Sequence, residues 1–281
     1  MQDEPEDFKI IECLCSWYDL LGFGQPLMDS NWDLNNEQCE SQLKRIKSLD
    51  LSYINTYSSA HGTTSFSLND GIILNYDIDD NILNIKEQIV KVLDDLVLEY
   101  ESLNVRDVRN GFPGVRGIIT FGHRYNYTHV ESTYSVSNNK TLAYHPQVFQ
   151  MNTAFSKAYI MESSGSKSGI AGNHLYIDKF LINSMEKILT KKKDDSPEYT
   201  IKREINSDSS TIHFTFYRDY TALLSLEFDK SPVEYNFKGI ETKLYKYINR
   251  QSRQDQLAQE AEFRRAQRYL QMEKEEFGEE K

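Results

Sequence analysis

The chain is poor in the groups that support several common kinds of site. Its 281 residues include only three cysteines. Cys13, Cys15 and Cys39 have no metal-binding spacing, and the first two are predicted to share one face of a strand as core residues. The chain has 32 Lys and Arg against 43 Asp and Glu, a formal net charge of -11. Because binding to a nucleic-acid backbone depends on clustered Lys and Arg, we expect no nucleic-acid partner.

Long apolar runs are also missing. No stretch approaches the roughly 20 apolar residues that a membrane-spanning helix needs, and no apolar signal begins the chain. We therefore expect no membrane partner and a cytoplasmic location. A length of 281 residues is enough to bury one good core and to carry an appendage.

The most informative feature is an acid that follows an apolar run. Residues 10–15 (IIECLC) predict a buried strand, and Asp19 lies near its carboxyl end. Gly22 and Gly24 allow the backbone to turn sharply and to come close to a ligand. Polyphosphate and a hard cation could then reach the Asp19 carboxylate and the Leu20 carbonyl.

A second acid lies in a turn sequence. Residues 69–71 (NDG) enter an apolar run and predict a hairpin with Asp70 at its tip. If this hairpin lies beside the first strand, two carboxylates converge, which is the arrangement that a pair of magnesium or manganese ions needs. The alternative is that Asp19 and Asp70 are plain turn residues, because aspartate followed by glycine is common in turns.

The order of the predicted elements indicates the fold class. Helical periodicity covers residues 37–49 and 82–103, and strands are predicted over 51–58 and 115–121. The order strand, helix, hairpin, helix, strand predicts an α+β fold with a ferredoxin-like core.

The rest of the chain predicts an extension of this core. A helix from Lys179 to about Lys192 precedes antiparallel strands within 199–228, and residues 241–277 have the composition of a long charged helix. We therefore divide the chain into a main domain over 8–195, a β-rich extension over 196–240 and a C-terminal helix over 241–281. That helix is predicted either to pack on a partner subunit or to be solvated.

Five short motifs occur in an order that resembles the class III nucleotidyl cyclases, the adenylate and guanylate cyclase catalytic domain, including the bacterial pyrimidine cyclases of antiphage signalling. Residues 19–23 (DLLGF) resemble the first metal motif of that family, and residues 69–71 resemble its second metal aspartate at a hairpin tip. The other three resemble the strand after the long helix, the next helix with its characteristic glutamate, and the last short strand: residues 115–122 (VRGIITFG), residues 158–163 (AYIMES) with Glu162, and residues 175–178 (LYID). The agreement runs from about residue 8 to about residue 180.

The resemblance implies a cyclase core and two-metal catalysis with Mg²⁺ or Mn²⁺. Asp19, Asp70 and the Leu20 carbonyl would hold the metal ions. Phosphate would rest on the backbone amides of the turn that follows, formed by Leu21, Gly22, Phe23 and Gly24. The resemblance also implies a homodimer, because family members complete each site with residues from the second subunit.

Other positions depart from the purine cyclases. Phe66 stands where a lysine helps to recognise the base, and the purine-contacting acid falls near Phe149 or Gln150. The transition-state asparagine falls at Ser156, and the transition-state arginine falls at Ile160, which cannot stabilise phosphate charge. Lys157 is the candidate for the missing catalytic cation.

Three hypotheses remain open from the sequence. The first is a cyclase that converts a nucleoside triphosphate, such as a pyrimidine one, to a 3',5'-cyclic monophosphate and pyrophosphate, and so signals to a cyclic-nucleotide-responsive effector in antiphage defence. The second is a catalytically degenerate relative that acts as a nucleotide sensor or a protein-interaction subunit. The third is an α+β interaction module in which Asp19 and Asp70 are only turn residues.

Overall fold

The structure is a computed structural model, and the part of the chain that it describes is residues 9–49, 63–78, 84–126, 133–137, 140–144, 149–191, 197–205, 210–253, 255 and 257–258. The predicted strand over 51–58 lies outside these residues. The described part is a mixed fold of helices around one large sheet, so the predicted α+β class is confirmed.

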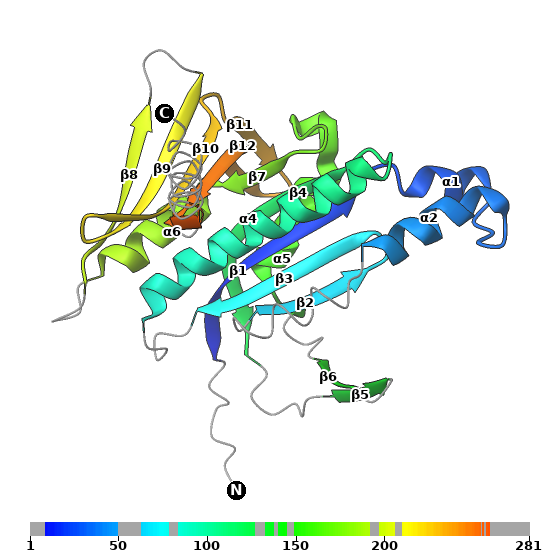
Figure 1. The fold of residues 1–281 in the computed structure, drawn as a ribbon, viewed down its shortest axis with the longest axis horizontal. Helices are drawn as coiled ribbons and strands as arrows, with labels where there is room; N and C mark the ends of the chain where they lie inside the picture. Colours follow the sequence, from blue (N-terminus) through cyan, green and yellow to red (C-terminus); the bar gives the residue numbers. More distant parts are fainter. Residues whose placement is uncertain are drawn as a thin grey trace, which may run out of the picture.

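The first half of the chain forms the predicted ferredoxin-like core (Figure 1). Its strands lie in the order β2-β3-β1-β4, and every neighbouring pair is antiparallel. The strands are β1 (Ile10–Leu20), β2 (Thr63–Leu68), β3 (Gly71–Ile78) and β4 (Val115–Tyr125). Helices α1 (Gly24–Asp29) and α2 (Glu37–Ser48) follow β1, and α4 (Ile85–Arg109) connects β3 to β4.

Strand β1 is buried on both faces, and its alternate residues belong to two separate apolar cores. Leu14, Tyr18 and Leu20 pack in the core beneath α4. Buried residues of α6 (Lys179–Thr190) belong to the same core. Cys13 and Trp17 pack in the core beneath α5 (Thr153–Ser164) on the opposite face. Because side chains alternate along a strand, Asp19 shares the α5 face with Trp17.

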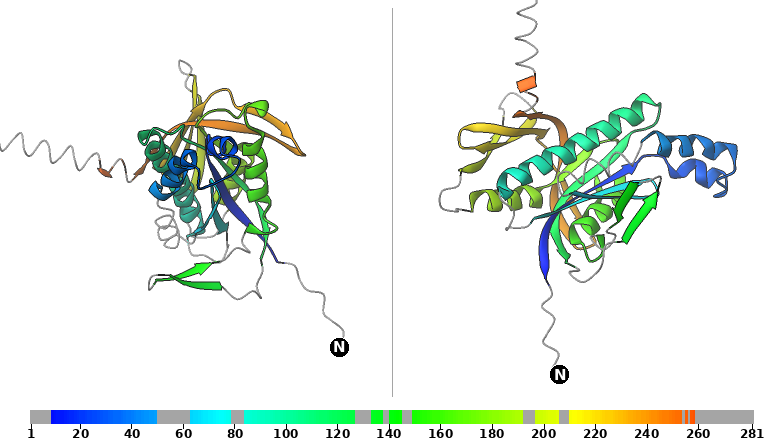
Figure 2. Two further views of the ribbon diagram at one scale, coloured as in Figure 1. Left: turned by 90° about the vertical axis from the view of Figure 1, so that its right-hand side faces the viewer. Right: turned by 60° about the horizontal axis from the view of Figure 1, so that its bottom comes forward.

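The second half of the chain widens the same sheet (Figure 2). Strand β7 pairs in parallel with β4, and beyond it the order continues β12-β10-β9-β8, while β11 pairs with β12. These strands are β7 (Leu175–Asp178), β8 (Tyr199–Ile205), β9 (Thr211–Arg218), β10 (Thr221–Asp229), β11 (Val233–Phe237) and β12 (Ile240–Ser252). The short 3-10 helix η2 (Gly165–Ser168) follows α5, and a separate hairpin joins β5 (Thr133–Ser137) to β6 (Lys140–Tyr144). Among the described helices, none is both long and apolar enough to cross a bilayer.

The prediction of a helix from residue 241 is wrong for residues 241–252. These residues form most of β12, which pairs with β7, β10 and β11. Leu244, Tyr245 and Tyr247 are buried in the sheet, so local burial decides the conformation and the charged composition of the wider segment does not. Residues 259–281 lie outside the described part, and the division of the chain at residues 195 and 240 stays a prediction.

Candidate active site

The end of β1 and the tip of the β2–β3 hairpin place two acids side by side. Asn69 and Asp70 form a two-residue turn in which Asn69 has a φ of 54°, so the predicted hairpin with Asp70 at its tip is confirmed. The Leu20 amide donates to the Asp70 carbonyl at 3.1 Å, and Asp19 is the register partner of Gly71. The charge of Asp70 acts on the Asp19 carboxyl, so the two acids lie close together.

A third carboxylate and a guanidinium complete this cluster. Arg116 lies directly opposite Asp19 on β4, and its Nε donates to Glu162 Oε1 at 2.7 Å within an ion pair. Glu162 is 4% exposed, and its second oxygen accepts a hydrogen bond from Trp17 Nε1 at 3.3 Å. Glu162 also lies close enough to Asp19 to act electrostatically on its carboxyl group. The sequence analysis identified Glu162 only as a residue characteristic of the family it resembles, and it assigned no role to Arg116 or Trp17.

Burial and like charge raise the pKa of Asp19. The pKa rises from 3.8 to about 7, first because the carboxyl is removed from water and then because Glu162 and Asp70 lie close to it, while Arg116 acts in the opposite direction. At Asp19, one guanidinium therefore acts against two neighbouring carboxyl groups. A bound cation would relieve this excess of negative charge.

The donor atoms fit a hard divalent cation. Mg²⁺ is usually held by one or two carboxylates together with substrate phosphates, and Asp19 and Asp70 supply such a pair. The Leu20 carbonyl follows Asp19 directly in sequence. It accepts from the Phe23 amide at 3.3 Å, which leaves its second lone pair for a cation. Glu162 is committed to Arg116 and Trp17. In the described residues no group of three or more His, Cys, Asp or Glu side chains is arranged to hold a metal ion, so a cation here would depend on Asp19, Asp70, the Leu20 carbonyl and oxygen atoms of a substrate.

The turn after β1 has only part of the predicted phosphate-binding geometry. Gly22 has a φ of 72°, a conformation that favours glycine, whereas Gly24 has no such requirement and begins α1. The Leu21 amide already donates to the Gly114 carbonyl at 3.1 Å, and the Phe23 amide closes the turn. A phosphate at this turn would therefore have to use the amides of Gly22 and Gly24.

Lys157 does not join the acids of its own chain. Its ammonium lies 3.8 Å from Asp178 Oδ2 and 4.6 Å from the centroid of the Phe180 ring. Burial lowers the pKa of Lys157, while the Asp178 carboxylate raises it. By strand register Asp178 lies level with a β1 residue four positions before Asp19, about 13 Å along the sheet.

The neighbouring positions of α5 are also occupied locally. The Ser156 hydroxyl donates to the Asn152 carbonyl one turn earlier at 2.9 Å, and the Ile160 carbonyl lies 3.4 Å from the Tyr235 hydroxyl. Within one chain, the candidates Ser156 and Lys157 are therefore separate from Asp19 and Asp70.

The predicted base-recognition positions carry an aromatic pair. The ring centroids of Phe66 on β2 and Phe149 lie 5.8 Å apart, and both side chains pack at the edge of the core beneath α5. Phe149 also contacts Phe155 at 6.4 Å, and Phe155 contacts Trp17 at 6.0 Å. A row of aromatic rings thus leads from these positions to the acidic cluster.

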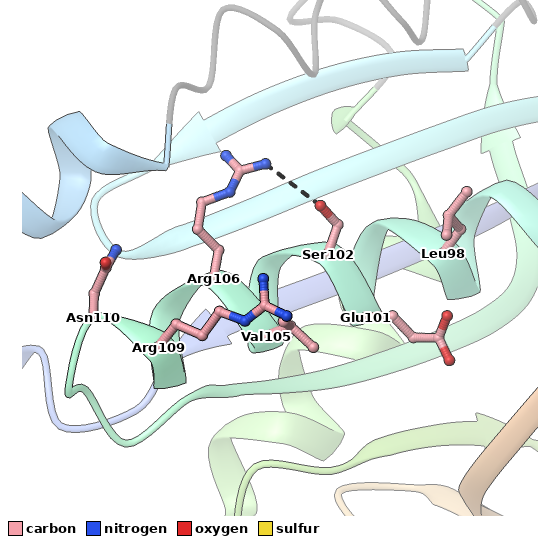
Figure 3. A pocket seen from close by; sticks show the side chains of 7 residues that line it. All are labelled: Leu98, Glu101, Ser102, Val105, Arg106, Arg109 and Asn110. Atoms are coloured by element: carbon pink, nitrogen blue, oxygen red, sulfur yellow. Dashed lines mark hydrogen bonds between the residues drawn. The ribbon is translucent and has the colours of Figure 1, made fainter.

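A hollow of about 450 Å³ lies elsewhere, along the C-terminal half of α4 (Figure 3). Its lining comes from α4 and the residue after it, including Leu98, Val105 and Arg109. Neither Asp19 nor Asp70 lines it. The hollow is therefore separate from the acidic cluster.

Comparisons with known proteins give a likeness in fold only. No protein-family model matches the chain, and no curated protein matches it. Solved structures that match include the adenylyl cyclase CyaB from P. aeruginosa (10% identity, TM-score 0.45, covering 89% of this chain and 98% of that chain) and the guanylyl cyclase Cya2 (12%, 0.39, 85% and 93%). Another is the guanylate cyclase domain of RhGC from Catenaria anguillulae in complex with GTP (12%, 0.40, 86% and 100%). These TM-scores are too low to carry an argument, so the proposal below depends on the site itself.

Proposed function

We propose that this chain is a nucleotidyl cyclase that converts a nucleoside triphosphate to a 3',5'-cyclic monophosphate and pyrophosphate. The observation that carries the proposal is the convergence of Asp19 and Asp70 at the end of β1, held by the hydrogen bond from the Leu20 amide to the Asp70 carbonyl. The acidic cluster also carries excess negative charge and oxygen donors suited to Mg²⁺ or Mn²⁺.

The chain's own residues would divide the work of cyclisation. Bound Mg²⁺ or Mn²⁺ would lower the pKa of the 3'-hydroxyl and neutralise charge on the phosphates. Asp19, Asp70 and the Leu20 carbonyl would hold the metal ions. Arg116, whose guanidinium is fixed by Glu162, would add positive charge beside the phosphates.

The second subunit of a homodimer is part of the proposal. Lys157 and Ser156 lie away from the acids of their own chain. In a homodimer with shared sites, Lys157 from one copy would supply a cation to the acids of the other. A site divided in this way would be inactive in a monomer.

The altered base positions support a proposal about the substrate. Phe66 stands where the purine cyclases have a base-recognising lysine, and it contacts Phe149, which with Gln150 is a candidate for the position of their purine-contacting acid. Neither the lysine nor an acid is therefore present at these positions. We propose a pyrimidine triphosphate as the substrate. A cytoplasmic enzyme of this kind would make a cyclic messenger for an effector in antiphage defence.

A second candidate function is a nucleotide sensor or interaction subunit without turnover. Ile160 carries no charge, and Lys157 is already engaged with Asp178 and Phe180. If these positions left the transition state without a cation, metal-dependent nucleotide binding would persist and product would not form.

The test is chromatography of each nucleoside triphosphate after incubation with the purified chain and Mn²⁺. We expect a cyclic monophosphate from a pyrimidine triphosphate, and we expect Asp70→Asn to abolish it. Asp29→Asn makes the same chemical change at an exposed residue of α1 and should leave product formation intact.

The possible results separate the hypotheses. A cyclic purine product would correct the substrate and keep the cyclase. Metal-dependent nucleotide binding without product would favour the sensor. Neither product nor binding would leave Asp19 and Asp70 as turn residues of an interaction module.

A further inference from the structure

Arg45 is a buried cation outside the acidic cluster. It lies on α2, which projects with α1 beyond the end of β1 (Figure 1, Figure 2), and only 1% of the residue is exposed. Its Nε and Nη2 donate to the two carboxylate oxygens of Asp107 on α4 at 2.7 and 2.6 Å. The Phe112 ring covers the guanidinium, with its centroid 4.7 Å from Cζ. Arg45 is therefore held in one orientation.

The remaining donors of Arg45 bond to the backbone beside the metal site. Nη1 donates to the Leu21 carbonyl at 3.0 Å, and Nη2 donates to the Gly114 carbonyl at 3.4 Å. Asp107 accepts from the Gly114 amide at 3.0 Å, and the Leu21 amide donates to the Gly114 carbonyl at 3.1 Å. One ion pair thus ties together the turn after β1 and the loop before β4.

This arrangement is directional as well as stabilising. A buried ion pair is costly to desolvate, and apolar residues of similar volume often stabilise a fold equally well. A planar guanidinium can bind both oxygens of a carboxylate and still donate to a carbonyl on its other side, which a lysine cannot do. The carbonyl that receives this extra bond belongs to Leu21, which follows Leu20 and precedes the left-handed Gly22.

We propose that Arg45 is a positioning residue for the metal site: through Asp107 and the Leu21 carbonyl, it holds the turn that presents Asp19 and the Leu20 carbonyl to the metal ion. The inference rests on the proposed function. It also links the placement of α2 to the metal site, because α2 cannot shift without breaking the bond to Leu21.

The test measures Mn²⁺ affinity through a single tryptophan. Trp17 and Trp32 are the two tryptophans of the chain, and Trp17 is buried and bonded to Glu162. In a Trp32→Phe background, quenching of Trp17 fluorescence by Mn²⁺ reports binding at the acidic cluster, with the Asp70→Asn variant as the control for site occupancy.

Arg45→Met combined with Asp107→Leu replaces the ion pair by apolar side chains and leaves no buried charge unpaired. We expect its Mn²⁺ affinity to fall about 10- to 100-fold, the effect typical of losing a residue that orients a metal ligand. The matched control is Arg124→Met combined with Asp77→Leu, which removes an ion pair near the other end of β1. It should change the melting temperature without changing Mn²⁺ affinity more than about twofold.

Each outcome decides something. A folded double variant that binds Mn²⁺ as tightly as the parent overturns the positioning role. If the double variant does not fold, Arg45→Lys decides, since it keeps the charge opposite Asp107: unchanged affinity overturns the inference, and weakened affinity supports it. A parent that binds no Mn²⁺ overturns the proposed metal site and the inference together.

Discussion

The two ends of β1 carry charged clusters on the same face of the sheet, and these clusters differ in their balance of positive and negative charge. Near the start of β1, Arg124 on β4 pairs with Asp77 on β3 through two hydrogen bonds, one cation to one anion. Beside this pair, Asn152 caps the first turn of α5 and donates to the Asn75 side chain at 2.8 Å. The polar groups at this end satisfy one another.

The other end is left unbalanced. There, among the described residues, Arg116 is the cation that acts on Asp19, against the nearby carboxyl groups of Glu162 and Asp70, and the pKa of Asp19 is raised to about 7. Unpaired buried charge destabilises a fold, so a cluster of this kind is expected where a ligand completes it. The difference between the two ends marks the first as a structural clamp and the second as a candidate site.

The largest expected effect on stability comes from packing at the acidic end. A Cβ on Gly71 would lie 1.8 Å from the Trp17 ring, so Gly71→Ala must displace Trp17 and its bond to Glu162. We expect a loss of about 3 kcal/mol in the free energy of unfolding, measured by urea denaturation. Gly24→Ala is the matched control, because its Cβ meets nothing within 4 Å, and it should change stability by less than about 0.5 kcal/mol. Equal effects of the two variants would refute the tight packing of Trp17 on Gly71.

A smaller effect, of opposite sign, is expected from Asp19→Asn. In the folded state Asp19 has a pKa of about 7 against the ordinary 3.8, so the folded protein holds a proton that the unfolded chain releases between these values. The contribution of Asp19 to the stability of the metal-free wild type should therefore fall as pH rises from 4 to 7 and then level off. The asparagine of Asp19→Asn does not titrate, so the variant does not lose stability in this way. We expect its free energy of unfolding to be about 2 kcal/mol higher than that of the wild type at pH 8, with the difference vanishing near pH 4.

The measurement is a series of thermal or urea unfolding curves in chelator across this pH range. Asp29→Asn, at an exposed position, should follow the wild-type profile. Loss of Mn²⁺ binding together with increased stability would identify Asp19 as a residue retained for function at a cost to the fold. A destabilised Asp19→Asn variant at pH 8 would contradict this interpretation.

The smallest effect is expected at the balanced end. Arg124→Met removes the cationic partner of Asp77, but Asp77 still accepts a hydrogen bond from the Asn75 side chain, and its own side chain is 33% exposed, so water can solvate it. We expect a loss of about 1 kcal/mol in unfolding free energy and no change in Mn²⁺ affinity. A weakened Mn²⁺ site in this variant would show that the two ends of β1 are coupled and would remove the contrast between them.

Local patterns were enough to predict much of the core and the two acids. The turn sequence around Asp70 and the glycine after Asp19 act over a few residues, and the predicted hairpin and the left-handed Gly22 both occur. The helices after β1 and after β3 also follow from apolar spacing. The expected roles of these residues in metal and phosphate binding stay predictions.

The partners of the acids could not be predicted in the same way. Arg116 meets Asp19 only because of the β1–β4 register, and Glu162 reaches both because α5 packs on that face of the sheet. Nothing near Arg45 in sequence indicates its bond to the Leu21 carbonyl. The placement of Lys157 beside Asp178 likewise depends on how α5 lies against β7.

The sequence by itself determined the order of the core elements, the Asp70 hairpin and the acid at the end of β1, because turn preferences and periodic burial act locally. Tertiary structure decided that residues 240–252 form a strand, that Asp19 shares a cluster with Glu162 and Arg116, and that Lys157 lies apart from it. Strand register and helix packing join residues that are far apart in the chain, and the charge balance of a site depends on which residues they join.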